Sequence, residues 1–324
     1  MRIQSILAAL FAVALTSVAR AETCSLAQMA SLDMTMLPDG KFAVPVSING
    51  TEHKFMVDTA GIFSRLAESS AQKLSLKTAP TGIELYGVGG KIHMASADIE
   101  SFKLGNNEAK HFHLGIGGFD SRGSDVDGIL SQDLLTLFDI EFDFAAKKMN
   151  LFSPEHCLGK VVYWTRSGYA ELPFHFTSGA VNAIQHIDMD ISLDDQNLTT
   201  DFDTGSPSTW LRYKAAERSF GLDQNSPGVT NSPLSTKDQP AFRKQFGLLK
   251  IGGVEVRNPV IDIIPDHFDE AFKHEHSEKS RDDPIYGSVM NMEPLTFGMD
   301  VISRLHTYIS FKEHKIYVTA ADAH

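Results

Sequence analysis

The chain has 324 residues, of which 42% are hydrophobic and 22% are charged, and its formal net charge is -12. This composition is that of a globular protein, and it excludes a disordered tail, a collagen-like rod and a disulfide-dense miniprotein. The acidic balance argues against nucleic acid as a partner, because attraction to phosphates needs clustered Lys and Arg. The length predicts about two domains of roughly 150 residues each.

The N-terminus has the pattern of a secretory signal peptide. Met1-Arg2 gives a positive start, Ile6 to Leu15 is an apolar run, and Ala19-Arg20-Ala21 is a cleavage pattern. The run is too short to span a bilayer, and a buried N-terminal helix is the alternative. We therefore expect residues 1–21 to be a signal peptide cleaved near Ala21 and the mature protein to be secreted or periplasmic. The sequence predicts no membrane span elsewhere.

Cys24 and Cys157 are the only two cysteines. An oxidising compartment favours a disulfide between them, and two free buried thiols are the alternative. Closing a loop of this length contributes about 4–5 kcal/mol in the chain-entropy model. Such a bridge would join the start of the mature chain to the end of its first half.

Most of the mature chain has the pattern of short strands separated by Gly, Asn and Pro. In chain order, strands are expected at 42–48, 52–58, 83–88, 92–99, 112–116, within 177–193 and at 198–203. Short helices are expected at 64–73, 132–137, 214–220 and 300–305, and hairpins at 140–152 and 307–318. The glycine-rich segment 87–90 joins two strand patterns, which favours a hairpin tip over a phosphate-binding loop. The predicted fold class is mainly β.

A long-range repeat relates the two halves of the chain. Phe55-Met56-Val57-Asp58-Thr59-Ala60-Gly61 recurs as Thr200-Asp201-Phe202-Asp203-Thr204-Gly205-Ser206, an apolar strand that ends in Asp-Thr and a turn of small residues. Later in each half, Gln132-Asp133-Leu134-Leu135 corresponds to Met299-Asp300-Val301-Ile302. Two matches in the same order indicate a duplicated unit. The second half is longer because of the loop-like stretch 265–294.

At these residues the chain resembles the aspartic peptidases, and in particular the retropepsin-like bacterial branch that places two lobes in one chain. The motif Asp203-Thr204-Gly205-Ser206 carries the resemblance, together with Trp210-Leu211 and Phe297-Gly298-x-Asp300. The resemblance implies two pseudo-symmetric, acid-protease-like β-barrel lobes, residues 22–160 and 161–324, that form a central cleft. It implies a monomer with an intramolecular pseudo-dimer, a peptide or protein substrate, and neither a cofactor nor a metal ion.

The resemblance also implies the site. Asp58 and Asp203 would form a catalytic dyad that activates water, because two carboxylates about 3 Å apart cannot both ionise and titrate as a unit. Thr59 and Thr204 would cross-link the two loops. The other residues that would shape the active-site loops are Ala60, Gly61, Gly205, Ser206, Ser131 and Gly298. The flap over the cleft would be the hairpin that carries Tyr86, Gly87, Gly89 and Gly90.

The first lobe departs from the family pattern at two positions. Ala60 and Ser131 stand where the family has Gly, although Gly61 follows directly after Ala60. We expect a strained backbone at Ala60, if its φ is positive, and a narrower pocket around Asp58. Two functions therefore stay open: an exported aspartic-type endopeptidase, and a catalytically impaired peptide-binding or structural module on the same fold.

Other residues suggest different sites. His267, His274 and His276 lie among acidic residues, but their stretch is rich in charge and favours a solvated loop over a metal site. Ser64 and Ser206 lack the G-x-S-x-G elbow of a serine hydrolase. Asp133 and Asp300 are interpreted as charges at the N-termini of the later helices.

Overall fold

The computed structural model of the chain describes residues 25–87, 90–117, 125–176, 186–235, 240–266 and 293–322, and gives the backbone alone for 84–87 and 90–92. The expected signal peptide, Cys24, Gly89 and the His267, His274 and His276 group lie outside this part of the chain. The Cys24–Cys157 bridge, the signal peptide and the two lobe boundaries therefore stay predictions.

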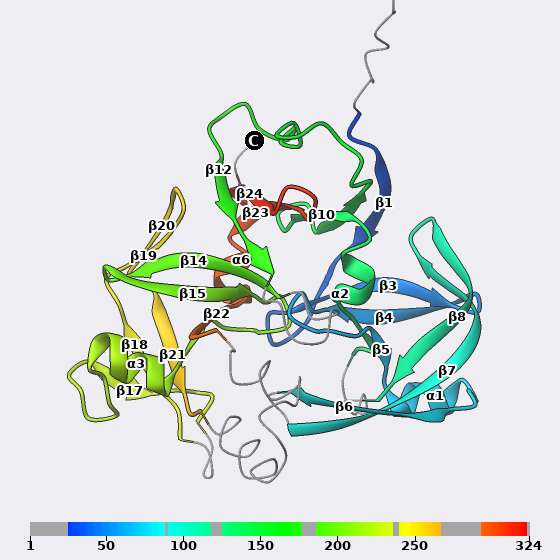
Figure 1. Cartoon of the computed structure of the whole chain (residues 1–324), viewed down its shortest axis with the longest axis horizontal. Helices are drawn as coiled ribbons and strands as arrows, with labels where there is room; N and C mark the ends of the chain where they lie inside the picture. The colour runs from blue at the N-terminus through cyan, green and yellow to red at the C-terminus, as the bar shows by residue number, and fades with distance from the viewer. Residues whose placement is uncertain are drawn as a thin grey trace, which may run out of the picture.

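The first lobe is built around an eight-stranded sheet with the order β2-β3-β4-β9-β5-β8-β7-β6. Its strands are β2 (Thr35–Met36), β3 (Phe42–Ile48), β4 (Thr51–Val57), β5 (Arg65–Leu66), β6 (Ala79–Gly87), β7 (Gly90–Leu104), β8 (Asn107–Ile116) and β9 (Gly128–Leu130). Two short helices accompany it, α1 (Glu68–Lys73) and α2 (Gln132–Leu135). Figure 1 shows this lobe in blue to green on one side of the molecule.

The second lobe is built around a ten-stranded sheet with the order β17-β18-β21-β16-β22-β15-β14-β19-β20, and β13 pairs with β14. Its strands are β13 (His175–Phe176), β14 (Ile187–Leu193), β15 (Gln196–Phe202), β16 (Trp210–Arg212), β17 (Val229–Asn231), β18 (Phe242–Gln245), β19 (Leu248–Ile251), β20 (Val254–Arg257), β21 (Val260–Ile264) and β22 (Leu295–Phe297). The helices in the described part of this lobe are α3 (Tyr213–Phe220) and α6 (Met299–Ile302).

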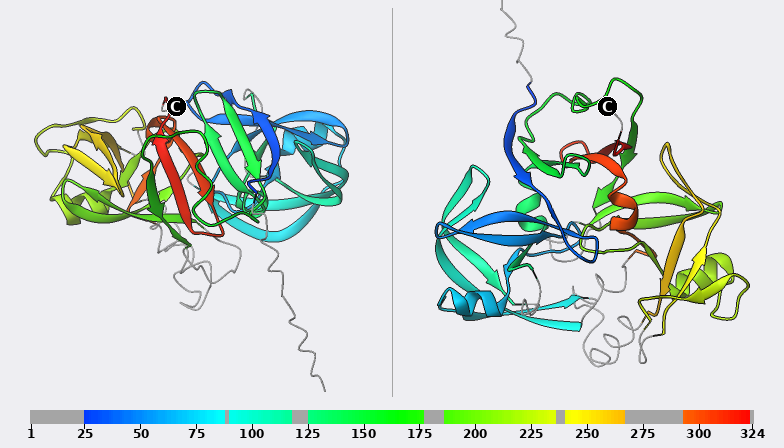
Figure 2. Two further views of the ribbon diagram at one scale, coloured as in Figure 1. Left: turned by 90° about the horizontal axis from the view of Figure 1, so that it is seen from above. Right: turned by 180° about the vertical axis from the view of Figure 1, so that it is seen from behind.

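A third sheet of six strands takes strands from both halves of the chain, in the order β1-β11-β10-β23-β24-β12. Its strands are β1 (Gln28–Asp33), β10 (Asp139–Asp143), β11 (Lys148–Phe152), β12 (Ala170–Pro173), β23 (Leu305–Ser310) and β24 (Lys315–Ala320). The halves meet where β10 pairs with β23, with Ile140 opposite Ile309. Figures 1 and 2 show this sheet between the two lobes. The predicted mainly β, bilobal fold is confirmed.

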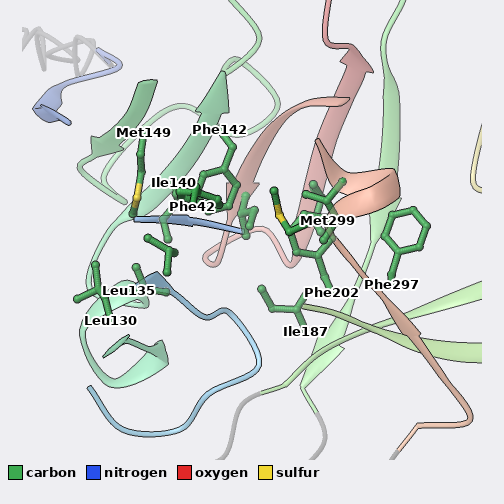
Figure 3. Close-up of a cluster of buried hydrophobic side chains, with 14 of the residues drawn as sticks. Phe42, Leu130, Leu135, Ile140, Phe142, Met149, Ile187, Phe202, Phe297 and Met299 are labelled. Carbon is green, nitrogen blue, oxygen red and sulfur yellow. The ribbon is translucent and has the colours of Figure 1, made fainter. Parts of the chain in front are cut away.

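The hydrophobic core is continuous between the lobes. Phe42 of β3 is fully buried and packs edge-on against Phe142 of β10, with ring centroids 5.4 Å apart. Figure 3 shows first-lobe side chains of this cluster beside Phe202 and Met299 of the second lobe. Burying each side chain of this size contributes about 1.5–3 kcal/mol, so the shared core holds the lobes in one arrangement.

The repeat seen in the sequence is a repeat of strand pairing. In the first lobe β4 lies parallel to β9, with Val57 opposite Leu130, and in the second lobe β15 lies parallel to β22, with Phe202 opposite Phe297. In both lobes the next strand, β5 or β16, pairs antiparallel with the same partner. The turns that carry Asp58 and Asp203 therefore leave the ends of equivalent strands.

Candidate active site

Asp58 and Asp203 occupy equivalent positions directly after β4 and β15. The backbone N–H of Asp58 donates to the carbonyl of Leu130 at 2.9 Å, and that of Asp203 donates to the carbonyl of Phe297 at 3.0 Å. The neighbouring strand thus fixes the start of each turn. The register of the strand pairing therefore sets the backbone position from which each carboxylate extends.

Each turn folds back so that its own N–H groups hold the carboxylate. Asp58 Oδ1 accepts from the N–H of Ala60 at 3.2 Å and from that of Gly61 at 2.7 Å. Asp203 Oδ1 accepts from the N–H of Gly205 at 2.7 Å. Such donors stabilise an ionised carboxylate and fix its orientation.

The two carboxylates flank Gly205. A Cβ built on Gly205 would lie 2.6 Å from Asp58 Oδ1 and 3.0 Å from Asp203 Oδ1. Both oxygens are therefore within 3.0 Å of a single point, which brings the carboxylates of the two lobes side by side. Only glycine leaves this space empty.

The two threonines that follow these aspartates cross-link the lobes. The N–H of Thr59 donates to Thr204 Oγ1 at 3.1 Å, and the N–H of Thr204 donates to Thr59 Oγ1 at 3.0 Å. Each hydroxyl then donates to a carbonyl of the opposite lobe, Thr59 to Phe202 at 2.6 Å and Thr204 to Val57 at 2.9 Å. Both side chains are buried, so these four bonds are shielded from water.

A second contact, which the sequence analysis missed, ties each turn to its later helix. Asp133 Oδ1 accepts from the backbone N–H and the hydroxyl of Ser64, at 2.8 and 2.6 Å. Asp300 Oδ1 accepts from the same two groups of Thr209, at 2.8 and 2.7 Å. Both aspartates lie in the first turn of their helices, as predicted, but these bonds are what they contribute to the site. Aligning the repeats would have paired Ser64 with Thr209.

The electrostatics of the site favour one bound proton. Burial raises the pKa of Asp203 well above its usual range, and the negative charges of Asp58 and Asp201 raise it further. Burial also raises the pKa of Asp201 to about 6. Because like charges this close cannot all ionise, a proton is retained near Asp203 above the pH at which an exposed carboxyl loses it.

Two further basic groups, also missed from the sequence, lie close enough to interact with Asp58. Burial lowers the pKa of the Arg65 guanidinium, and Asp58 and Asp133 oppose that shift. Burial also lowers the pKa of His186, opposed by Asp58. Arg65 and Trp210 occupy equivalent strand positions, since they lie opposite β9 and β22 in the same register. A buried arginine therefore stands in the first lobe where the second lobe has a tryptophan.

The predicted flap segment forms a hairpin. β6 and β7 pair with Gly87 opposite Gly90, and Tyr86 lies opposite Lys91. In Figure 1 this hairpin extends from the first lobe toward the middle of the molecule. Its function as a flap stays a prediction.

The predicted backbone strain at Ala60 does not occur, because the positive φ on which it depended is absent. Ala60 is not among the residues with positive φ, and no positive φ occurs at Gly61 or Gly205 either. Any L-residue can adopt the backbone conformations of these turns. Glycine is needed at Gly61 and Gly205 because neighbouring atoms leave no room for a side chain. Any effect of Ala60 on the site would therefore come from the volume of its methyl group.

Two comparisons relate this chain to known proteins. A family model described as aspartyl protease matches residues 44–134, from β3 to α2 of the first lobe. The crystal structure of aspartic proteinase from Irpex lacteus superposes with a TM-score of 0.52 at 12% sequence identity, covering 90% of this chain and 97% of that one. At this identity the likeness is one of fold. The chain matches no curated protein sequence.

Two further features are absent from the described segments. No group of three or more His, Cys, Asp or Glu residues there could hold a metal ion. No helix there has the length and hydropathy to cross a bilayer.

Proposed function

We propose that this protein, a retropepsin-like aspartic peptidase by its first-lobe family match and its bilobal fold, is an exported aspartic-type endopeptidase. The observation that carries the proposal is the placement of Asp58 and Asp203 on either side of Gly205, with a raised pKa at Asp203. Peptide hydrolysis by carboxylates needs one group that accepts a proton and one that donates it, and this pair supplies both.

In the proposed reaction, Asp58 takes a proton from a water molecule while the water oxygen bonds to the scissile carbonyl carbon. Asp203 gives its proton to the carbonyl oxygen, which forms a neutral tetrahedral diol. The diol then returns one hydroxyl proton to Asp203, Asp58 protonates the amide nitrogen, and the carbon–nitrogen bond breaks. Asp203 is the proton donor because burial and its acidic neighbours favour its protonated form.

The decisive experiment measures cleavage of casein or a peptide library between pH 3 and 7. Asp58→Asn and Asp203→Asn should each lower kcat by at least about a hundredfold, since each removes one half of the proton transfer. Asp190→Asn is the matched control, because Asp190 is exposed and lies outside the site. Equal activity in all four proteins would exclude the proposed dyad.

A second measurement tests the intermediate. A statine-type inhibitor resembles the tetrahedral diol, and such analogues bind about a hundredfold or more tighter than substrates. Its affinity should fall in both dyad variants and stay unchanged in Asp190→Asn.

Export is the remaining part of the proposal, and the segment 1–21 supports it. Expression in a bacterium with fractionation should give a periplasmic or secreted chain that begins at Glu22. An intact Met1 on the purified protein would contradict it.

One observation favours the alternative function, a catalytically impaired peptide-binding module. Ala60 carries a methyl group at the turn position that Gly205 leaves empty in the second lobe, where a Cβ would lie 2.6 Å from the opposite Asp58 carboxylate. Crowding of the dyad would permit peptide binding without turnover. Saturable binding of a peptide, with no cleavage products after prolonged incubation at any pH from 3 to 7, would identify this function.

A further inference from the structure

Ser131 is a buried hydroxyl beside the first-lobe carboxylate. The residue is 0% exposed, and its Oγ has no hydrogen-bond partner among the residues that the structure describes. A Cβ built on Gly61 would overlap Ser131 Oγ and would lie 2.7 Å from Asp58 Oδ2. The hydroxyl and the outer carboxylate oxygen therefore border the same small space, which exists because residue 61 is glycine.

The second lobe has the opposite arrangement of serine and glycine. There the turn residue is Ser206, whose hydroxyl donates to the carbonyl of Ser208 at 2.8 Å and accepts from Trp210 Nε1 at 3.2 Å. The residue equivalent to Ser131 is Gly298, where a Cβ would overlap the carbonyl of Ser208. Each lobe thus has one serine and one glycine at these two positions, in exchanged order.

We propose that Ser131 is a positioning residue of the first lobe, whose hydroxyl donates a hydrogen bond to Oδ2 of Asp58 in the working enzyme. The inference rests on the proposed function. The backbone donors of the turn both bind Oδ1 of Asp58, so a donor at Oδ2 would fix the other end of the carboxylate. Because both atoms border the space at Gly61, a shift of the Ser131 hydroxyl toward Oδ2 would supply that donor.

Ionisable groups also lie near Asp58. Asp203 faces it across Gly205, and Arg65 of β5 and His186, directly before β14, interact with it. Each of those groups is ionisable. Ser131 differs because its hydroxyl stays a neutral donor over the whole working range, so its deletion should move the profile without adding a new titration.

The first test is the pH profile of kcat/KM. Ser131→Ala removes only the hydroxyl oxygen, and the ionised carboxylate then loses a charge-assisted donor. The acidic limb of the profile should move up by about one pH unit, so that kcat/KM falls about tenfold at pH values below the limb. Ser70→Ala is the control, because Ser70 is also buried and donates to an aspartate, Asp127, outside the site.

The second test exchanges the residues between the two positions. Gly61→Ser alone places a side chain where Ser131 Oγ and Asp58 Oδ2 already lie and should abolish activity. The double variant Gly61→Ser/Ser131→Gly takes the residue types of Ser206 and Gly298, but its new Cβ still lies 2.7 Å from Asp58 Oδ2. Its kcat/KM should therefore stay below that of Ser131→Gly, and an acidic limb restored to the wild-type position would show that a hydroxyl at residue 61 replaces the one assigned to Ser131.

A readout independent of catalysis separates this inference from the proposed function. Carboxyl carbon NMR of aspartate-labelled protein, with Asp58 assigned through Asp58→Asn, follows the titration of Asp58 directly. Ser131→Ala should move that titration to higher pH even if the wild type cleaves no substrate. An unmoved Asp58 titration in folded Ser131→Ala, judged by an unchanged thermal midpoint relative to Ser70→Ala, would overturn the inference.

Discussion

Ala60 is the difference between the two halves of the site that we expect to affect catalysis most. Its N–H donates to Asp58 as the N–H of Gly205 donates to Asp203, so the two backbones perform the same function. The difference is one methyl group. Because Gly205 lies between the carboxylates and Ala60 is the equivalent residue of the first lobe, we expect that methyl to lie near the dyad from the other side.

Removing this methyl should increase activity. Ala60→Gly is expected to raise kcat/KM several-fold, because the dyad and its water gain room while both N–H bonds to Asp58 remain. The reciprocal variant, Gly205→Ala, adds a Cβ 2.6 Å from Asp58 Oδ1 and should lower kcat/KM by about a hundredfold or more. Unchanged kinetics in both variants would show that space at these positions does not limit the reaction.

At the scale of elements, the sequence predicted best where one strand is followed by a turn of fixed composition. The span of β3, the end of β4 before Asp58 and the pairing of the two halves all follow from the alternation of side chains and from the Asp-Thr repeat. The later short strands of the second lobe, β16 to β21, were missed. Most have three to five residues, so their hydrophobic pattern is too brief to separate from a loop, and tertiary pairing defines them.

The residues of the site also divide into those that the sequence pattern predicts and those that it does not. Asp58, Asp203 and the two threonines are visible because they repeat as a contiguous motif. Arg65, His186 and Ser64 are not, since each reaches the site from a segment whose placement depends on strand pairing. Ser131 was visible only as a departure from the family pattern, and its meaning required the position of Gly61.

The segment after β11 is held to the shared sheet by the contacts of one buried histidine. His156 Nε2 lies 2.6 Å from Asp139 Oδ2 on β10, with the two side chains 1% and 0% exposed. Burial raises the pKa of Asp139, and the neighbouring His156 opposes that rise. Removing His156 would leave the buried Asp139 with the hydroxyl of Tyr308, at 3.3 Å, and the N–H of Phe311, at 3.1 Å, as donors.

His156→Gln should therefore lower the free energy of unfolding by about 1.5–3 kcal/mol, the contribution of one hydrogen bond to a charged group, measured by urea denaturation near pH 6. Adding Asp139→Asn should recover part of that loss. Lys148→Gln is the comparison, because its bond to Asp33 at 2.7 Å is solvent-exposed and should contribute no more than about 1 kcal/mol. A loss in His156→Gln as small as that in Lys148→Gln would show that the buried pair does not hold the segment.

For the whole molecule, stability should depend on pH through its buried carboxyls. Burial is the largest cause of a raised pKa at Asp133, Asp139, Asp201, Asp203 and Asp300. An acid with a raised pKa in the folded state binds more protons there than in the unfolded chain. Between the unfolded and folded pKa values, the free energy of unfolding therefore falls as the pH rises. The net charge of -12 acts in the same direction, because deprotonation increases self-repulsion.

The thermal midpoint should accordingly be higher at pH 4.5 than at pH 7.5, by about 5 °C or more. Asp201 identifies the window, since its pKa rises from 3.8 to about 6 and the steepest fall is expected between those values. Asp201→Asn is neutral at every pH and should flatten this part of the curve, whereas Asp190→Asn, on an exposed position, should leave it unchanged. A thermal midpoint that rises from pH 4.5 to 7.5 would mean that these carboxyls are already ionised in the folded protein, and the proton assigned to Asp203 in the proposed reaction would lose its physical basis.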